Sequence, residues 1–197
     1  SRGLNNEAVD TGSHRLPGRL SNSSSLHMSI HWLLQTLDDC PEILNSEQVP
    51  VWLSAAEQQR LSTLKVEKRR RDWLLGRSTA KRLLQVFLQQ TQEITTSLEA
   101  ITIGNDEDGA PFAITDQRLP VSLAISHSHG HAFCAVVESH IEGAQGSAET
   151  RLGCDLEYIE AREPSFVRGF FTEEEMTIFA ASAHPDELVT AIWSAKE

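Results

Sequence analysis

The chain has 197 residues, 40% hydrophobic and 23% charged, with a formal net charge of −11, which suits one soluble domain with a sizeable core or two small ones. Its longest apolar runs, such as residues 132–137, are far shorter than the about 20 residues that a membrane-spanning helix needs. Residues 1–25 contain no apolar segment of a secretory signal, and three scattered cysteines cannot form a disulfide framework. We therefore expect a cytoplasmic protein with no membrane partner.

The first half of the chain is predicted to be mainly helical. Residues 1–27, rich in Ser, Asn, Gly and Arg, are expected to form a disordered leader, and residues 30–37 have the composition of a strand. Ser54 and Glu57 form a capping box that begins a helix. Apolar spacing predicts a second helix over residues 66–90. Gly76 lies inside this helix and indicates that another segment approaches its backbone closely.

Strands and turns are predicted to follow, and then helices. The expected strands are residues 98–103, 121–125, 132–137 and 151–157, with turns over residues 104–111 and a loop over residues 143–147. Thr172 and Glu175 form a second capping box. Pro185 ends the helix that this box begins, and residues 186–197 are expected to form a further helix.

Positive charge is concentrated in one segment of this acidic chain. Residues 60–82 contain nine of the 17 basic residues and only two acidic ones, so the segment carries +7 and the remainder −18. Such a segment favours an anionic partner. A solvated helix face is the usual alternative, and nucleic-acid binding is another, although Trp73 is the only aromatic residue within the segment and no nucleic-acid motif surrounds it.

Three carboxylates are candidate metal ligands. On a strand over residues 151–157, Asp155 and Glu157 share one face, roughly 7 Å apart by strand rise. Oxygen ligands of this kind favour Mg²⁺ or Mn²⁺ over Zn²⁺, but an ordinary polar strand face would show the same pattern. Glu197 continues the apolar helical stripe of Val189 and Trp193, where a buried charge needs a partner or a metal. A frayed helix end with Glu197 in water is the alternative.

The alternating histidines His127, His129 and His131 suggest a transition-metal site, but Gly130 interrupts the strand and no cysteine lies nearby as a fourth ligand. One functional histidine at a strand end, with the other two on the surface, is the preferred interpretation.

The order of these segments resembles that of the Sfp-type 4′-phosphopantetheinyl transferases over about residues 28–197. Hallmarks of this family are a G-x-P-x-F loop, an S-H-S segment, G-x-D-x-E, F-F-[ST]-x-x-E and W-[ST]-x-K-E-x-x-x-K. The corresponding segments here are residues 109–112 (with Gly109, Pro111 and Phe112), 126–128, 153–157, 170–175 and 193–197. Each motif alone is weak, whereas the ordered set is highly specific.

The resemblance implies roles for individual residues. Asp155 and Glu157 match the acidic pair that holds Mg²⁺, and Glu197 matches a third metal ligand that is also a candidate general base. His127 matches a histidine that contacts a phosphate of coenzyme A. The remaining residues that the resemblance assigns to coenzyme A binding are Arg60, Arg71 and Arg77 near the 3′-phosphate, Gly109 and Pro111 in the loop against the adenine, Ser126, and Lys196.

The implied fold is α+β, with two similar halves related by a pseudo-twofold axis. Residues 28–142 would form the first half and residues 143–197 the start of the second, which we expect to be incomplete because the family's second lysine would fall beyond Glu197. The implied activity is Mg²⁺-dependent transfer of 4′-phosphopantetheine from coenzyme A to a serine of an acyl or peptidyl carrier protein, by a monomer that binds no nucleic acid. The alternatives are a non-catalytic module that binds coenzyme A or a carrier protein, and a basic-helix nucleic-acid binder.

Overall fold

The computed structural model describes residues 29–44, 48–139 and 150–197. The expected leader over residues 1–27 and the expected loop over residues 143–147 lie outside these ranges. The α-helices and strands are β1 (His31–Thr36), α1 (Ala55–Thr63), α2 (Glu67–Gln92), β2 (Thr102–Asn105), β3 (Pro111–Ile114), β4 (Val121–Ser128), β5 (His131–Glu138), α3 (Pro164–Phe170), α4 (Glu173–Ala181) and α5 (Pro185–Lys196). Short 3₁₀ helices cover Leu37–Asp39, Pro41–Leu44 and Leu98–Ala100. The predicted α+β class is confirmed.

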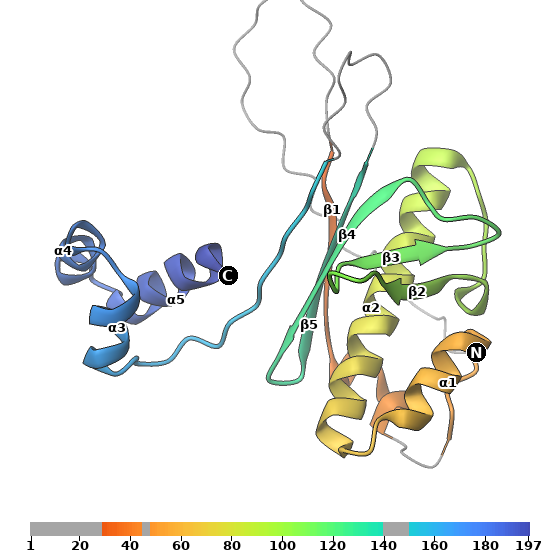
Figure 1. Cartoon of the computed structure of the whole chain (residues 1–197), viewed down its shortest axis with the longest axis horizontal. Helices are drawn as coiled ribbons and strands as arrows, with labels where there is room; N and C mark the ends of the chain where they lie inside the picture. The colour runs from red at the N-terminus through yellow and green to blue at the C-terminus, as the bar shows by residue number, and fades with distance from the viewer. Residues whose placement is uncertain (1–28, 45–47, 140–149) are drawn as a thin grey trace, which may run out of the picture.

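Three antiparallel strands form the main sheet in the order β1-β5-β4, and β2 and β3 pair as a separate hairpin (Figure 1). β4 and β5 are joined by a tight turn at His129 and Gly130, whose φ angles of 48° and 75° are both positive. Glycine adopts this conformation without steric cost. The predicted interruption at Gly130 is therefore a hairpin turn.

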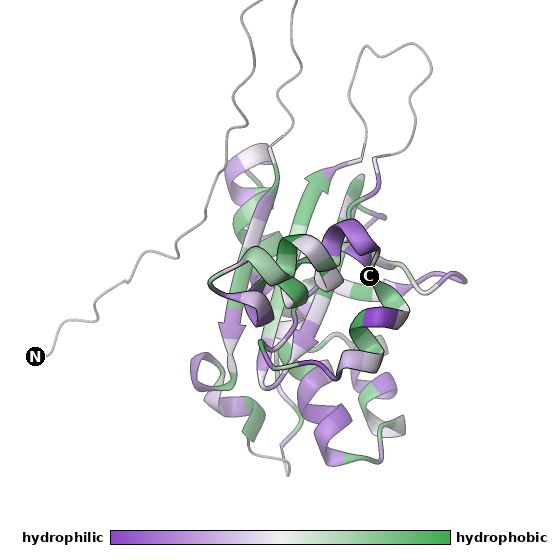
Figure 2. Cartoon of the chain, turned by 90° about the vertical axis from the view of Figure 1, so that its left-hand side faces the viewer, coloured by the Kyte–Doolittle hydropathy of each residue, from purple (hydrophilic) through white to green (hydrophobic). Residues whose placement is uncertain are grey.

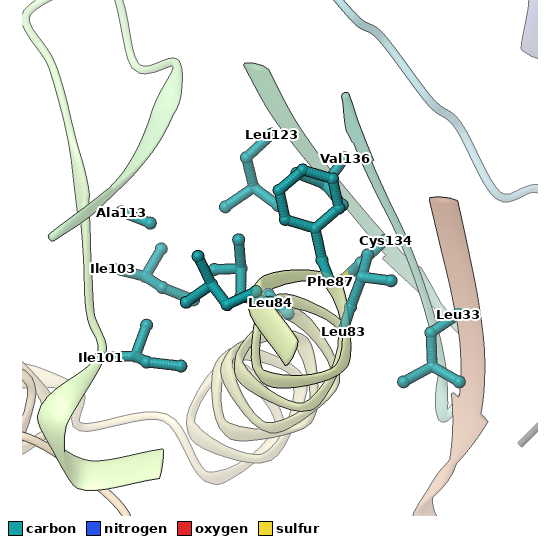
Figure 3. Packing of buried hydrophobic residues seen from close by; sticks show 12 residues of the cluster. Leu33, Leu83, Leu84, Phe87, Ile101, Ile103, Ala113, Leu123, Cys134 and Val136 are labelled. Atoms are coloured by element: carbon teal, nitrogen blue, oxygen red, sulfur yellow. The ribbon is translucent and has the colours of Figure 1, made fainter. Parts of the chain in front are cut away.

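The long helix α2 forms the centre of the core. Its apolar residues pack against the main sheet on one side of the helix and against the β2–β3 hairpin on another (Figure 3). Leu84 and Phe87 of this helix are almost fully buried, as are Ile103 of β2 and Val136 of β5. Burial of a side chain of this size stabilises a fold by about 1.5–3 kcal/mol, so this shared face holds α2 and both sheets in fixed relation.

Gly76 allows α2 and β4 to approach closely, as the sequence predicted. A Cβ atom at Gly76 would lie 3.2 Å from Ile125 Cγ2 and 3.5 Å from His127 Cδ2, both on β4. The first distance is shorter than ordinary van der Waals contact, so a side chain at position 76 would push against the strand. The close approach places His127 beside the middle of α2.

The C-terminal helices α3, α4 and α5 form a second, smaller cluster. Phe171, Phe179 and Val189 are its buried residues, and Trp193 packs against them. In Figure 1 the three helices form a group of their own, reached by an extended segment that begins beside the sheet. Figure 2, in which these helices face the viewer, shows hydrophobic residues on each of them. The sequence predicted α4 and α5 but not α3.

Three predicted elements were wrong in detail. Residues 98–103 were expected to form one strand, but residues 98–100 form a 3₁₀ turn and β2 begins only at Thr102. Gly104 and Asn105 were expected in a turn and lie in β2. Residues 151–157 form no strand, because serine side chains rather than a backbone ladder hold this segment against β4, as described below.

None of the helices in the described part of the chain is both long and apolar enough to cross a membrane.

Candidate functional site

The segment that carries the predicted acidic pair is attached to β4 by two serines. The amide of Leu152 donates to Ser122 Oγ and the amide of Leu156 to Ser126 Oγ, each at 3.0 Å. Ser122 and Ser126 are four residues apart on β4, and alternate residues of a strand share one face. The two hydroxyl groups therefore fix the register of residues 152–156 along the strand.

One carboxylate oxygen of Asp155 is bonded to β4, and the other has no hydrogen-bond donor among the described residues. Ser126 Oγ donates to Asp155 Oδ1 at 3.2 Å. Asp155 Oδ2 is buried and finds no hydrogen-bond donor among the described residues. A buried carboxylate oxygen without a donor costs free energy. A divalent cation would remove that cost, so Asp155 fits the predicted role of a metal ligand.

Glu157 is engaged by the segment that follows it. Arg162 donates to Glu157 Oε2 at 2.9 Å, and its other terminal nitrogen forms an ion pair with Glu160 Oε1 at 3.1 Å. The guanidinium also lies 5.4 Å from the ring centroid of Phe166 in α3. A cation bound at Glu157 would have to replace this contact with Arg162.

Glu197 follows the last residue of α5 at the C-terminus, within the helical cluster (Figure 1). Asp155 is instead bonded to Ser126 of β4, and Glu157 lies beside the β4–β5 turn. Over residues 29–44, 48–139 and 150–197, no three His, Cys, Asp or Glu side chains gather closely enough to hold a metal ion. The structure therefore does not bring the three predicted carboxylates together. Lys196, predicted to bind coenzyme A, instead pairs with Glu175 of α4.

Arg77 of the basic helix is buried rather than exposed, and only 8% of its surface is accessible. It donates to Asn105 Oδ1 at 2.8 Å, and Asn105 Nδ2 donates to the carbonyl of Gly109 at 2.7 Å. Trp73 lies beneath the guanidinium, 5.3 Å from ring centroid to Cζ. Through Asn105, Arg77 thus positions the loop that was predicted to lie against the adenine. The Nε atom of Arg77 is buried and has no hydrogen-bond partner among the described residues.

The other predicted phosphate contacts lie around Arg77 to different degrees. Burial lowers the pKa of Arg77, nearby Glu57 raises it, and the positive charge of Arg60 lowers it further; Arg60 is therefore within electrostatic range of Arg77. His127 is exposed and adjoins Gly76. Arg71 is only partly buried, with Nε 4.0 Å from Glu67 Oε1. His127 thus lies beside the residue that precedes Arg77 on α2, whereas Arg71 lies one to two turns earlier on the same helix.

Gly109 lies in the loop between β2 and β3, and Pro111 is the first residue of β3. Gly109 has a φ of 86°, and Asp106 Oδ1 accepts from the amide of Ala110 at 2.9 Å. The ring of Phe112 lies directly across Gly104 on the neighbouring strand, leaving no room for a Cβ atom there. The Arg118 guanidinium covers the ring at 4.5 Å from its centroid. These contacts hold the loop in one conformation.

Two cavities flank the acidic segment. One of about 380 Å³ is lined by Pro111 and its loop, by β4, and by residues 150–154. A second of about 400 Å³ is lined by the β4–β5 turn and by residues 156–159, including Glu157. Burial raises the pKa of the thiol of Cys154, which lines the first cavity, to about 11.

Sequence reasoning missed the residues that act through others. Asn105, which bridges Arg77 to Gly109, was expected only as a turn residue, and Ser122 carried no motif at all. Glu175 was noted as a capping residue, but its pairing with Lys196 was not predicted. The contacts from Asn105 to Arg77, from Ser122 to Leu152 and from Glu175 to Lys196 each join residues at least 21 positions apart. No local sequence pattern therefore indicates them.

Residues 151–197 match the model of the 4′-phosphopantetheinyl transferase superfamily. A search of curated proteins gave no significant match. Among solved structures, a holo-(acyl-carrier-protein) synthase from Bacillus anthracis in complex with CoA (3′,5′-ADP) is similar at 27% identity, covering 57% of this chain and 97% of that one with a TM-score of 0.46. The Helicobacter pylori holo-[acyl-carrier-protein] synthase in complex with coenzyme A is 20% identical, covering 56% and 99% with a TM-score of 0.41.

Because both TM-scores are below 0.5, the assignment rests on the sequence match, which contains Asp155, Glu157 and Glu197. Residues 151–197 of this chain are thus similar to the 4′-phosphopantetheinyl transferase superfamily. The narrower Sfp type and the pseudo-twofold pair of halves stay predictions.

Proposed function

We propose that the protein transfers the 4′-phosphopantetheine group from coenzyme A to a serine of an acyl or peptidyl carrier protein. The observation that carries this proposal is the superfamily match over residues 151–197, which contains all three predicted carboxylates. The similar solved structures include complexes with coenzyme A. Both proposed substrates agree with the predicted cytoplasmic location.

Asp155, Glu157 and Glu197 would hold the Mg²⁺ ion. The orphaned buried oxygen of Asp155 supports this role, and an all-oxygen donor set suits Mg²⁺. When bound, the ion would neutralise charge that develops on the pyrophosphate during transfer. Glu157 becomes available once Arg162 turns fully to Glu160, to which it is already bonded. Glu197 would have to approach from α5.

The basic region around Arg77 would bind the nucleotide end of coenzyme A. Arg60, Arg77 and His127 supply cationic or hydrogen-bonding groups for a phosphate, and Ser126 lies between them and the acidic segment. The loop with Gly109 and Pro111 faces the cavity of about 380 Å³, where an adenine would have room. The buried Nε of Arg77, which has no partner among the described residues, supports an anionic ligand here.

The chemistry follows from these positions. The serine Oγ of the carrier protein attacks the β-phosphorus of coenzyme A and forms a new P–O bond. The bond from that phosphorus to the oxygen bridging the two phosphates breaks, and its electron pair leaves with 3′,5′-ADP. Glu197 takes the serine proton, directly or through water, as general base. Asp155 and Glu157 would hold the ion, which when bound would supply positive charge beside the pyrophosphate.

A non-catalytic module that binds coenzyme A or a carrier protein is the second candidate. It is favoured by the distance in the fold between the α5 carboxylate and the acidic segment, and by the engagement of Glu157 with Arg162. Such a module would bind coenzyme A but transfer nothing. A nucleic-acid binder is less consistent with the structure, because Arg77 is buried and bonded to Asn105 instead of lining an exposed groove.

The test is intact-mass analysis of an acyl carrier protein and of a peptidyl carrier protein after incubation with the protein, coenzyme A and Mg²⁺. We expect a mass increase of one 4′-phosphopantetheine group that is lost with EDTA or when the carrier serine is replaced by alanine. Asp155→Asn should abolish the increase while leaving the circular dichroism spectrum unchanged, because an amide can still accept from Ser126.

Glu163→Gln is the matched control, since it removes an exposed carboxylate that follows the same segment and makes no side-chain capping bond to α3, and it should keep the activity. Coenzyme A binding by calorimetry without any mass increase would support the non-catalytic module. Full transfer by Asp155→Asn would remove the metal assignment.

A further inference from the structure

The proposed function gives no role to the segment Phe170–Glu175, although its sequence is one of the ordered motifs. In the structure this segment surrounds the ammonium group of Lys196. Lys196 Nζ donates to Glu175 Oε2 at 2.7 Å and to the carbonyl of Phe170 at 2.9 Å, and it lies 4.5 Å from the ring centroid of Phe171. A carboxylate, a carbonyl and an aromatic face thus bind one cation, 21 residues further along the chain.

The socket for Lys196, meaning Phe170, Phe171 and Glu175, is held rigidly by the start of α4. Thr172 is the N-cap of this helix, and its hydroxyl accepts from the amide of Glu175 at 3.3 Å. In return Glu175 Oε2 accepts from the amide of Thr172 at 2.8 Å. The same carboxylate oxygen therefore closes the capping box and binds Lys196. The capping box fixes the orientation of the Glu175 carboxylate independently of Lys196.

The two rings of the socket also fix the last turn of α5. Trp193 lies 4.8 Å from Phe166 and 5.1 Å from Phe170, measured between ring centroids, and Phe171 is buried against Phe179. Trp193 and Lys196 are three residues apart and so lie on one side of the helix. An apolar anchor and an ionic anchor together hold this turn at both of its ends.

Glu197 follows Lys196 directly, and its amide donates to the carbonyl of Trp193 at 3.2 Å. The position of its carboxylate therefore depends on both anchors. A lysine ammonium has three N–H donors, and two are used here, so Lys196 keeps one donor for a phosphate oxygen. The socket is thus compatible with the predicted contact of Lys196 to coenzyme A and would set its direction.

We infer that Glu175 is a positioning residue for the transfer reaction: through Lys196 it holds the end of α5 so that Glu197 is presented to the reaction centre. The catalytic consequence of this inference rests on the proposed function, whereas the contact between Glu175 and Lys196 does not depend on it. A carboxylate misplaced by about 1 Å can slow a reaction roughly a hundredfold, so the socket sets rate more than affinity.

The experiment compares Glu175→Gln with Glu174→Gln in the full chain. Both changes remove one negative charge from the first turn of α4, but only Glu175 contacts Lys196; within the described residues Glu174 makes no side-chain hydrogen bond or ion pair. For Glu175→Gln we expect kcat to fall at least tenfold, the KM for coenzyme A to change less than twofold, and Mn²⁺ binding by calorimetry to weaken several-fold. Glu174→Gln should match the wild type in all three.

Two further measurements do not depend on turnover. Amide hydrogen exchange in the last turn of α5, residues 193–197, should quicken about tenfold in Glu175→Gln and stay unchanged in Glu174→Gln. Lys196→Met should reproduce this effect, and the double variant should be no faster than either single one, because the two side chains act as one unit. Lys196→Arg, which keeps the ion pair, should restore slow exchange.

The outcomes separate the two proposals. If the wild type transfers nothing, the proposed function fails, while exchange in the α5 turn still decides whether Glu175 holds it. If Glu175→Gln leaves exchange, Mn²⁺ affinity and kcat at wild-type values, or if its effect and that of Lys196→Met multiply independently, the positioning role is wrong. A rise in KM for coenzyme A with unchanged kcat and unchanged exchange would also overturn it.

Discussion

Replacing the buried Lys81 by methionine should cost the protein a large part of its stability. Lys81 has no exposed side-chain surface and pairs with Glu57, whose side chain is 2% exposed. The lysine also donates to the carbonyl of Trp52 at 2.8 Å. Glu57 accepts from the amides of Ser54 at 2.9 Å and Ile103 at 3.1 Å. One ion pair therefore joins α1, α2 and β2.

The magnitude follows from what the change leaves behind. Methionine has nearly the shape of lysine, so Lys81→Met creates little cavity but leaves the Glu57 carboxylate buried without its counter-ion. Removing one partner of a buried ion pair typically costs about 3–5 kcal/mol, and a domain's whole stability is about 5–15 kcal/mol. Burial lowers the pKa of Lys81, and the hydrogen bond to Glu57 raises it, so Glu57 helps Lys81 to keep its charge. Replacing both, as Lys81→Met with Glu57→Gln, should cost less than the two single changes added, by about 1–3 kcal/mol.

Urea denaturation followed by circular dichroism measures the free energies of unfolding of the two single variants and of the double variant, each relative to the wild type. Lys68→Met is the matched control, because the Lys68 side chain is 80% exposed and its pairing with Asp72 lies on the surface of α2; it should change stability by less than about 0.5 kcal/mol. A cost below about 1 kcal/mol for Lys81→Met, or additive costs in the double variant, would refute this account of the buried pair.

Three other predictions follow from the site. Coenzyme A should bind more tightly than its 3′-dephospho form, and His127→Ala should narrow the difference; equal affinities by calorimetry would remove the 3′-phosphate role. Gly76→Ala should lower the free energy of unfolding by about 1 kcal/mol or less, because alanine favours the helix by about 1 kcal/mol while its Cβ atom would lie only 3.2 Å from Ile125. The same change should displace His127 and so weaken coenzyme A binding. An unchanged dissociation constant for coenzyme A would contradict this. The hydrogen bond from Lys196, together with that from the Thr172 amide, lowers the pKa of Glu175 below its usual 4.5, so the contribution of this pair is present above pH 4.5 and lost as the pH falls below it; thermal midpoints measured across that range should fall more steeply in the wild type than in Glu175→Gln.

The features that the sequence predicted correctly depend on neighbouring residues. Both capping boxes, Ser54 with Glu57 and Thr172 with Glu175, begin helices where expected. The apolar spacing that predicted a helix over residues 66–90 corresponds to α2, and β1, β4 and β5 follow their apolar runs. Gly76 indicated a close approach because a glycine inside a helix is unfavourable unless something needs the space. In each case the determining atoms lie within a few residues of one another.

The features that the sequence could not predict depend on which segments meet. The alternation in residues 151–157 is real, but whether such a segment joins a backbone ladder depends on its neighbour, and here Ser122 and Ser126 offer hydroxyl groups instead. Arg77 resembles the other basic residues of its helix, yet the β2–β3 hairpin covers it. α3 begins at Pro164, and its short apolar run gains stability from packing on Phe171 and Trp193, which follow it in the chain.

The position of Glu197 relative to Asp155 depends on one short connection. Asp155 is tied to β4 through Ser126, and Glu197 is tied to α4 through Lys196 and Glu175. Between these two fixed points the chain passes through residues 157–163, where Arg162 bonds Glu157 and Glu160 and lies against Phe166. Since Asp155 is bonded to β4 and Glu197 follows a lysine bonded to α4, any rearrangement that brings these two carboxylates together would have to change the conformation of this connection, including the ion pairs of Arg162.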